Sequence, residues 1–374
     1  MSRHSDFELC HTKLFYTTPQ RARAWGVEPR GANAIEWPYS FRIVRRVPGL
    51  GGANSQAYGV DENGQVVGLA ESSDPDPKTE NFCGFNTNHI CLPFLWQNGV
   101  MTPLATLCGH NGQAYAMNNL GVAAGVAENS TPDPTCPPPQ VFDFEAAKWV
   151  TWQPDQKPQE LPPYTGDSVG FALGLNDFGW VVGSSGSCED TVLQPFQGGP
   201  RAVLWQGDTP IDLGNLGAAF LNVAAAVNDF GVVTGGSSTG GGSIHTFLWT
   251  QPIGKMQDLG AVGADVMSFS TAINNQGQIV GQSCDANSDC RAYLWQNGHM
   301  MDLNALIPSN SGLYLLIAQG INDAGEIEGQ ALEKSTGELI GFLATPRRGG
   351  DSDQSLSPVQ TATNPMVLPE YVRS

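Results

Sequence analysis

Eight cysteines are the side chains of this 374-residue sequence whose type and spacing most clearly predict chemistry. They are Cys10, Cys83, Cys91, Cys108, Cys136, Cys188, Cys284 and Cys290. Two pairs are close in sequence, Cys83 with Cys91 and Cys284 with Cys290. An even number of cysteines in separate loops is typical of disulfides formed in an oxidising compartment, so we predict that both pairs are bonded.

The other four cysteines lie farther apart along the chain. A bond between Cys108 and Cys136 would be local, and it would leave Cys188 for Cys10 near the N-terminus. Metal binding by the thiols is the alternative, but no Cys-x-x-Cys occurs and the six histidines have no ligand-like spacing. We therefore favour disulfides for all eight.

A second candidate site is a short polar loop. Asp285, Asn287 and Asp289 alternate like the oxygen ligands of a calcium-binding loop. That loop needs Gly at its sixth position and Glu at its twelfth, where this sequence has Cys290 and Gln296. We keep a weak cation site at these three residues as a hypothesis, and we favour a polar loop closed by the adjacent disulfide.

Catalytic residues are not predicted. Ser238 lies in a Gly-x-Ser-x-Gly pattern with His245 nearby, but a nucleophile elbow needs a helix after the serine, and here a Gly-Gly-Ser stretch leads into another predicted strand. No stretch supplies a nucleophile, a base and an orienting group together. We therefore expect a protein that is not an enzyme and that has no cofactor.

The elements that position these residues come from a pattern that occurs six times. Its fullest copy is Ala272-Ile273-Asn274-Asn275-Gln276-Gly277-Gln278-Ile279-Val280-Gly281. The first turn residues of the copies are Asp61, Asn118, Asn176, Asn228, Asn274 and Asn322. Asn or Asp can hydrogen-bond the backbone two residues on, and the following Gly supplies a positive φ, so each copy predicts a tight β-hairpin. Ligand binding by these six side chains is the less favoured alternative.

Each hairpin is followed by a variable connector, a strand that ends in Trp, and a strand of the type x-Asp-Leu-Gly. The Trp residues are Trp96, Trp149 or Trp152, Trp205, Trp249 and Trp295. The hairpins are 57, 58, 52, 46 and 48 residues apart, which is the size of a four-stranded propeller blade. We predict an all-β, six-bladed propeller over residues 41–346, with a strand at 41–47 completing the last blade and closing the ring. An open β-solenoid is the alternative. The Trp side chains are expected to pack between blades.

Residues outside this region differ in composition. An irregular arm is predicted at 1–40, and eight of the 18 basic residues lie in the first 48 positions. The segment 347–374 is polar and is predicted to be a flexible tail. The net charge of −18 disfavours nucleic acid and anionic lipid surfaces as partners, and no apolar run is long enough for a membrane span or the core of a signal peptide.

The repeated motifs resemble those of the HAF-repeat family. The triplet that gives this family its name is best preserved as His245-Thr246-Phe247, with looser versions at Arg291-Ala292-Tyr293 and Pro93-Phe94. The resemblance covers roughly residues 41–346. It implies an extracellular bacterial protein with a propeller-like fold, and it implies no particular biochemistry.

The prediction of function rests on the face of the propeller whose connectors vary in length. The connectors between second and third strands differ most in length, and they hold Cys83, Cys91, Cys136, Cys188, Cys284 and Cys290. We expect a secreted, non-enzymatic binding module that uses this disulfide-stapled face to bind a protein or a glycan. A structural subunit of a larger extracellular assembly, held by the arm and the tail, and a polysaccharide-acting propeller enzyme are the alternatives.

Overall fold

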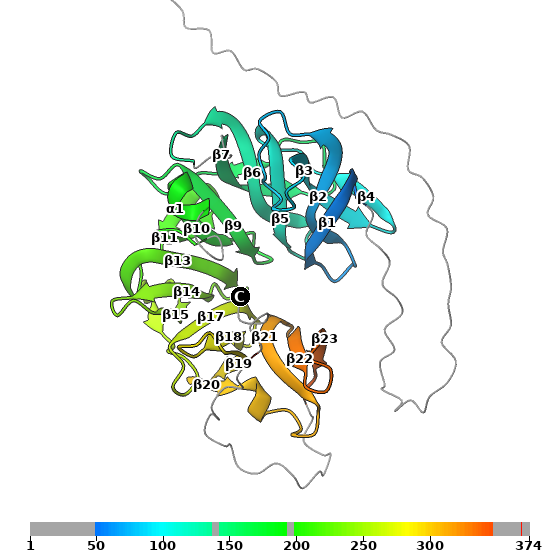
Figure 1. Ribbon diagram of the computed structural model, residues 1–374. Helices are drawn as coiled ribbons and strands as arrows, with labels where there is room; N and C mark the ends of the chain where they lie inside the picture. The colour runs from blue at the N-terminus through cyan, green and yellow to red at the C-terminus, as the bar shows by residue number, and fades with distance from the viewer. Residues whose placement is uncertain (1–48, 137–141, 193–197, 347–367, 369–374) are drawn as a thin grey trace, which may run out of the picture. The chain divides into compact units, whose positions relative to one another are not determined.

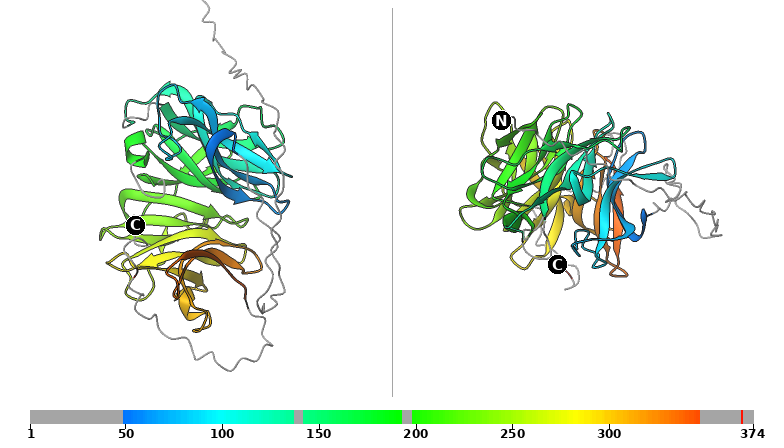
Figure 2. Two further views of the ribbon diagram at one scale, coloured as in Figure 1. Left: turned by 45° about the vertical axis from the view of Figure 1, so that its right-hand side comes forward. Right: turned by 90° about the horizontal axis from the view of Figure 1, so that it is seen from above.

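Residues 49–136, 142–192, 198–346 and 368 are described by the computed structural model (Figure 1). They belong to the second of two compact units of the chain, Pro48–Ser374. They form six antiparallel β-sheets, in each of which every strand pairs with the next one along the chain. The sheets follow one another in chain order from blue to orange (Figures 1 and 2). This is the six-bladed propeller of mostly four-stranded blades that the repeats predict.

The strands of the first two blades are β1 (Gly51–Val60), β2 (Val66–Pro75), β3 (His89–Gln97), β4 (Val100–Pro103), β5 (Cys108–Met117), β6 (Val122–Pro132), β7 (Phe142–Val150) and β8 (Gln159–Leu161). Those of the third and fourth are β9 (Val169–Leu175), β10 (Val181–Gly186), β11 (Arg201–Gln206), β12 (Thr209–Asp212), β13 (Gly217–Val227), β14 (Val233–Thr239), β15 (Ile244–Trp249) and β16 (Gln257–Asp258). Those of the last two are β17 (Met267–Ile273), β18 (Ile279–Cys284), β19 (Cys290–Gln296), β20 (His299–Asp302), β21 (Leu313–Ile321), β22 (Ile327–Glu333) and β23 (Leu339–Ala344).

The helical segments are short. They are α1 (Cys188–Val192) and the 3-10 turn η2 (Leu303–Ala305). No helix in the part of the chain that the structure describes is long and apolar enough to cross a membrane.

Antiparallel pairing gives each blade two ends. The turn face is made by the turns between first and second strands and between third and fourth strands, at residues 61–65, 98–99, 118–121, 151–158, 176–180, 207–208, 228–232, 250–256, 274–278, 297–298 and 322–326. The loop face is made by the connectors between second and third strands, described at 76–88, 133–136, 187–192, 240–243, 285–289 and 334–338, and by the links between blades.

The glycine that ends each copy of the motif allows the first two strands of a blade to pair. The first strand has a bulge opposite this glycine, for example between Ala57 and Gly59 in the first blade. A Cβ added to Gly68 would clash with the carbonyl oxygen of Gln56. The same clash would occur at the equivalent glycines, which are Gly125, Gly183, Gly235, Gly281 and Gly329.

Tryptophans at the ends of the third strands pack between blades, as the sequence predicts. Trp149 is buried against Val67 and Leu104 of the preceding blade, and its Nε1 donates to the carbonyl of Ala105 at 2.7 Å. Trp152 is 64% exposed, so Trp149 is the residue that serves the second blade. Equivalent apolar clusters lie at the other junctions between consecutive blades.

The sixth blade has three strands, β21, β22 and β23, among the described residues. The strand that was predicted at 41–47 to complete it lies outside these residues, as does the arm at 1–40. Closure of the ring by that strand stays a prediction.

Leu368 is the described residue of the predicted C-terminal tail. It is 3% exposed and packs with Tyr314, Leu316 and Leu332 of the sixth blade. Its N–H donates to Asp289 Oδ1 at 2.8 Å. The chain is therefore not a free flexible tail at this residue.

Candidate functional site

The loop face contains three disulfides. Cys83 is bonded to Cys91 and Cys284 to Cys290, which are the two short-range pairs that the sequence predicts. Cys108 is also disulfide-bonded. No free cysteine occurs in the part of the chain that the structure describes. The connectors of the first and fifth blades are thus each closed by their own covalent bond.

The third disulfide corrects the prediction for the remaining cysteines. Cys136 is bonded to Cys188, with 4.7 Å between their Cα atoms, so the predicted Cys108–Cys136 bond and the predicted Cys188–Cys10 bond are wrong. The two residues lie in the connectors of the second and third blades, 52 positions apart. Neighbouring blades bring equivalent connectors together, which distance along the chain does not reveal.

The same region holds a group with the composition of a metal site. Asp133, Cys136 and Cys188 place one ligand atom each within 4.8 Å of one another. The two sulfurs are bonded to each other, however, and a disulfide offers no thiolate ligand. The oxygens of Asp133 accept hydrogen bonds from Thr135 and from Ser168 Oγ. These contacts fix the junction between two connectors.

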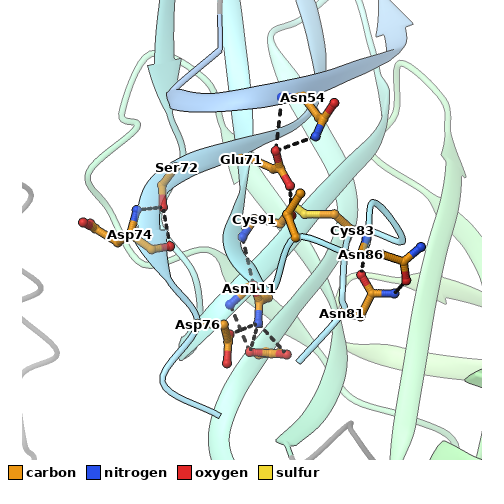
Figure 3. The surroundings of a disulfide bond; sticks show 12 residues. Asn54, Glu71, Ser72, Asp74, Asp76, Asn81, Cys83, Asn86, Cys91 and Asn111 are labelled. Atoms are coloured by element: carbon orange, nitrogen blue, oxygen red, sulfur yellow. Dashed lines mark hydrogen bonds between the residues drawn. A yellow bond between two sulfur atoms is a disulfide. The ribbon is translucent and has the colours of Figure 1, made fainter. Parts of the chain in front are cut away.

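A buried polar network surrounds the Cys83–Cys91 bond (Figure 3). Asn111 of the second blade is fully buried, and its Oδ1 accepts from the N–H of Cys91 at 2.9 Å. Its Nδ2 donates to Asp76 at 2.9 Å and to Glu128 at 3.1 Å. One side chain therefore joins the disulfide, the connector of the first blade and the second strand of the next blade.

Glu71 anchors the other end of this connector. Its Oε2 accepts from the N–H and Nδ2 of Asn54, at 3.1 and 2.8 Å, and its Oε1 accepts from Thr87 Oγ1. The backbone of the connector is unusual, because Thr79, Asn86 and Asn88 have φ values of 60°, 57° and 54°. Positive φ is uncommon outside glycine, above all for a β-branched residue, and such conformations persist where the surroundings impose them.

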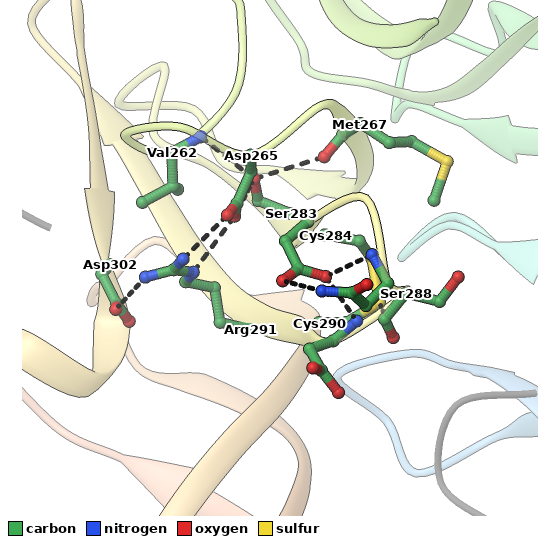
Figure 4. A network of polar contacts seen from close by, with 12 residues as sticks. Val262, Asp265, Met267, Ser283, Cys284, Ser288, Cys290, Arg291 and Asp302 are labelled. Atoms are coloured by element: carbon green, nitrogen blue, oxygen red, sulfur yellow. Dashed lines mark hydrogen bonds and ion pairs between the residues drawn. A yellow bond between two sulfur atoms is a disulfide. The ribbon is translucent and has the colours of Figure 1, made fainter. Parts of the chain in front are cut away.

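An ion-pair cluster supports the fifth blade (Figure 4). The side chain of Arg291 is 2% exposed and pairs with Asp265 at 2.7 Å and with Asp302 at 3.1 Å. Ser283 Oγ donates to Asp265 at 2.8 Å and accepts from the N–H of Val262 at 3.0 Å. Burial acts to lower the pKa of Arg291, but the bonds and charges of the two carboxylates outweigh it and raise the pKa above its ordinary value.

The cluster recurs in two other blades, which sequence reasoning missed. Arg201 in the third blade pairs with Asp167 and Asp212, and His245 in the fourth pairs with Asp258 at 3.0 Å. Each of the three basic residues lies four residues before the Trp of its strand, and Asp212, Asp258 and Asp302 are the acids of the x-Asp-Leu strands. The first residue of the HAF-like triplet therefore ties the third strand of a blade to the fourth.

The predicted cation loop is closed by its own hydrogen bonds. Asp285 Oδ1 accepts from the N–H groups of Asn287 and Asp289 at 2.8 and 3.0 Å, and its Oδ2 accepts from Asn287 Nδ2. Burial acts to raise the pKa of Asp285, but these bonds and the charge of Arg291 outweigh it and lower the pKa below its ordinary value. Asp289 Oδ1 accepts from Leu368. The contacts give these residues a structural role, and cation binding stays a hypothesis.

The turn residues of the motif have two roles on the turn face. The Oδ1 atom of each accepts from the N–H groups two and four residues later, as in Asn228 with Phe230 and Val232, which confirms the predicted turn chemistry. The Nδ2 atom donates at 3.0 Å to the backbone carbonyl of the equivalent residue in the next blade, from Asn118, Asn176, Asn228 and Asn274 in turn. A row of blade-to-blade bonds results, which was not predicted.

The Gly-x-Ser-x-Gly match is likewise structural. Ser238 lies at the end of β14 and is 4% exposed. Its Oγ donates to the carbonyl of Leu221 and accepts from the N–H of Leu221, both at 3.0 Å. His245 pairs in register with Ser237 and bonds Asp258. These contacts account for both side chains without a reaction.

Comparisons with known proteins concern the fold. No family model and no curated protein matches the sequence. Among solved structures, the chain is similar to the acylaminoacyl peptidase of Pyrococcus horikoshii, with 10% identity and a TM-score of 0.40 over 77% of this chain, and it spans about half (51%) of that protein. It is also similar to the SapL1 lectin in complex with alpha methyl fucoside, with 12% identity and a TM-score of 0.27 over 54% of this chain and 74% of the lectin. At such identities and scores, neither likeness carries an argument about function.

Proposed function

We propose that this protein is a non-enzymatic binding module whose loop face binds an extracellular protein or glycan, with the connector at residues 76–88 at the centre of the contact. The observation that carries the proposal is that this connector is fixed from several sides while several of its side chains are exposed at the surface. The Cys83–Cys91 bond, Glu71 and the Asn111 network hold its backbone.

The exposed residues of the connector have chemistry suited to recognition. Lys78, Thr79, Asn86 and Asn88 are exposed, and they present amine, hydroxyl and amide groups. A surface that is already fixed in its bound shape loses less conformational entropy on binding than a mobile loop does. The imposed positive φ values of three of these residues agree with a connector kept in one conformation.

The disulfides support an oxidising compartment. Three bonds and the bonded Cys108 are stable in an oxidising environment and rare in a reducing cytosol. This supports secretion, and it agrees with the resemblance of the repeats to those of extracellular bacterial proteins.

A variant that changes side chains and keeps the backbone tests the proposal. Lys78→Ala, Thr79→Gly and Asn88→Gly together remove three exposed groups, and glycine accepts the positive φ at the last two positions. We expect this variant to lose binding by roughly tenfold or more on arrays of bacterial surface glycans and secreted proteins, as expected for removal of central contacts.

The matched control makes the same kinds of change on the turn face. It carries Lys255→Ala, Asn98→Gly and Asn297→Gly, of which the two asparagines have φ values of 52°. It should bind like the unchanged protein, and all three proteins should share one melting temperature. Equal loss in both variants, or no binding by the unchanged protein, would contradict the proposal. Turnover of a polysaccharide that one carboxylate substitution abolishes would favour the enzyme alternative.

A further inference from the structure

Three consecutive turns of the turn face expose large apolar side chains. Leu120, Phe178 and Phe230 are 62%, 73% and 77% exposed, and they occupy the same position of the motif in the second, third and fourth blades. A single exposed apolar residue is ordinary, whereas an apolar row is typical of an interaction surface.

Neighbouring turns are held side by side by hydrogen bonds. The N–H of Asn119 donates to Asp177 Oδ1 at 3.1 Å, and the N–H of Asp177 donates to Asp229 Oδ1 at 3.0 Å. Because these residues directly precede Leu120, Phe178 and Phe230, the three apolar side chains occupy equivalent positions on three neighbouring turns.

The fold does not require apolar residues at this position. The other three blades build the same hydrogen-bonded turn with Asn63, Gln276 and Ala324. A tight turn projects this side chain away from the sheet, so a core contact does not explain Leu or Phe there.

Two indole rings extend the row. The ring of Trp152 covers the turn glycine Gly121, and the ring of Trp180 covers Gly231, since a Cβ on either glycine would lie within 2.7 Å of the indole. Trp152 is itself 64% exposed. Trp180 is half-buried and also packs against the core between the third and fourth blades. The apolar row is defined as Trp152, Leu120, Phe178, Trp180 and Phe230.

The negative charge of the turn face favours a basic partner. The turns that form the turn face contain eight acidic and two basic residues, among them Asp177 and Asp229 next to the exposed phenylalanines. Their carboxylates accept from neutral N–H donors, so the negative charge stays at the surface. A second copy of this face would be repelled, and a basic surface would be attracted.

We propose that the apolar row is a docking site for a protein segment in which apolar side chains alternate with Lys or Arg. Aromatic anchors with a rim of complementary charge are the usual source of affinity in protein interfaces. A glycan fits less well, because the Asn and Asp side chains beside the row are already used in bonds between turns. This site is on the opposite face from the one in the proposed function and does not depend on it.

The test uses the full chain and a random peptide library displayed on phage. The row variant carries Leu120→Asn, Phe178→Asn and Phe230→Gln, which are residue types that other blades tolerate at this position. The control variant is Phe220→Ser, because Phe220 is 64% exposed at the opposite end of β13. Peptides are selected on the unchanged protein and then synthesised.

We expect the selected peptides to combine apolar and basic residues, to bind the row variant roughly tenfold or more weakly, and to bind the control unchanged. Their affinity should fall as salt rises. Peptides without basic residues, equal binding to the row variant, or failure to enrich any peptide would overturn the proposal. Two further results would overturn the proposal. One is a dimer of the unchanged protein in light scattering that the row variant does not form, and the other is binding of the unchanged protein to a glycan array that the row variant loses.

Discussion

The amide of each turn asparagine does two things with two different atoms. In Asn228 the oxygen closes the turn of its own blade, and the nitrogen donates to the carbonyl of Asn274 in the next blade. Aspartate can do the first but has no N–H for the second. Asp61 has the equivalent position in the first blade, and its oxygens accept from Asn63 and Gln65 within the turn.

Substitution of Asn228 therefore separates the two roles. Asn228→Ala should lower stability more than Asn322→Ala, because Asn322 Nδ2 bonds Glu326 in its own turn and not another blade. We expect the difference to be about 1 kcal/mol, the usual value of one hydrogen bond. Urea unfolding of both variants measures it, and equal losses would show that the blade-to-blade bond adds no stability.

Buried charge makes Arg291 the most sensitive residue of its cluster. Arg291→Met would leave Asp265 and Asp302 buried without their cation, so we expect a loss of about 3 to 5 kcal/mol. Arg201→Met should cost less, because 33% of that side chain and 32% of the Asp212 side chain are exposed, so that only Asp167, at 7% exposure, is left buried without its cation. Comparison of the two unfolding midpoints decides this, and equal shifts would speak against a burial effect.

The lowered pKa of Asp285 predicts a dependence on pH. A carboxylate with a folded pKa below its unfolded value of 3.8 contributes stability above that pH and loses it as the pH falls through the folded pKa. Asn at position 285 could still accept the N–H bonds of the turn, so Asp285→Asn removes mainly the charge. The variant should melt below the unchanged protein at neutral pH, and the gap should close at low pH. A gap that is constant over pH would exclude the charge as its cause.

At the scale of elements, the sequence predicts contacts that follow from fixed spacing within the repeat and misses polar contacts between residues far apart along the chain. Asn and Gly in the turns and Trp at the third strands have fixed spacing within one repeat, and they predicted hairpins and packing correctly. The partners of Arg291 lie 26 and 11 residues away, and two partners of Asn111, Cys91 and Asp76, lie in another blade. A signal for the ion pairs was present, because Leu92 and Pro103 replace both the cation and the acid in the first blade.

The disulfides are expected to add different amounts of stability. Loop-closure entropy predicts about 4 kcal/mol for the 52-residue span of Cys136–Cys188 and about 2 kcal/mol for the 6-residue span of Cys284–Cys290. Replacement of the first pair by serine should therefore lower the melting temperature more than replacement of the second pair does. The opposite order, in thermal melts of the two double variants, would mean that the bond between connectors is not a main constraint.

The molecule as a whole has two faces of different chemistry. Residues 49–346 contain 29 acidic and 7 basic residues, so this part of the propeller is strongly anionic. The loop face is built from stapled polar connectors, whereas the turn face has the apolar row. These properties suit a module that holds partners by surface contact, and they make the loop face the first place to look for the main partner.

The proposal that the loop face binds the main partner is tested most directly by hydroxyl-radical footprinting. The labelling of the protein in its proposed extracellular surroundings is compared with that of the purified protein. We expect lower labelling of the peptide that spans residues 76–88 when the partner is present, and Phe82 and Phe85 provide the reactive rings in this peptide. Protection of that peptide would place the main partner on the loop face. Unchanged labelling there, with protection only at Phe178 and Phe230 or at no residue, would contradict the central claim.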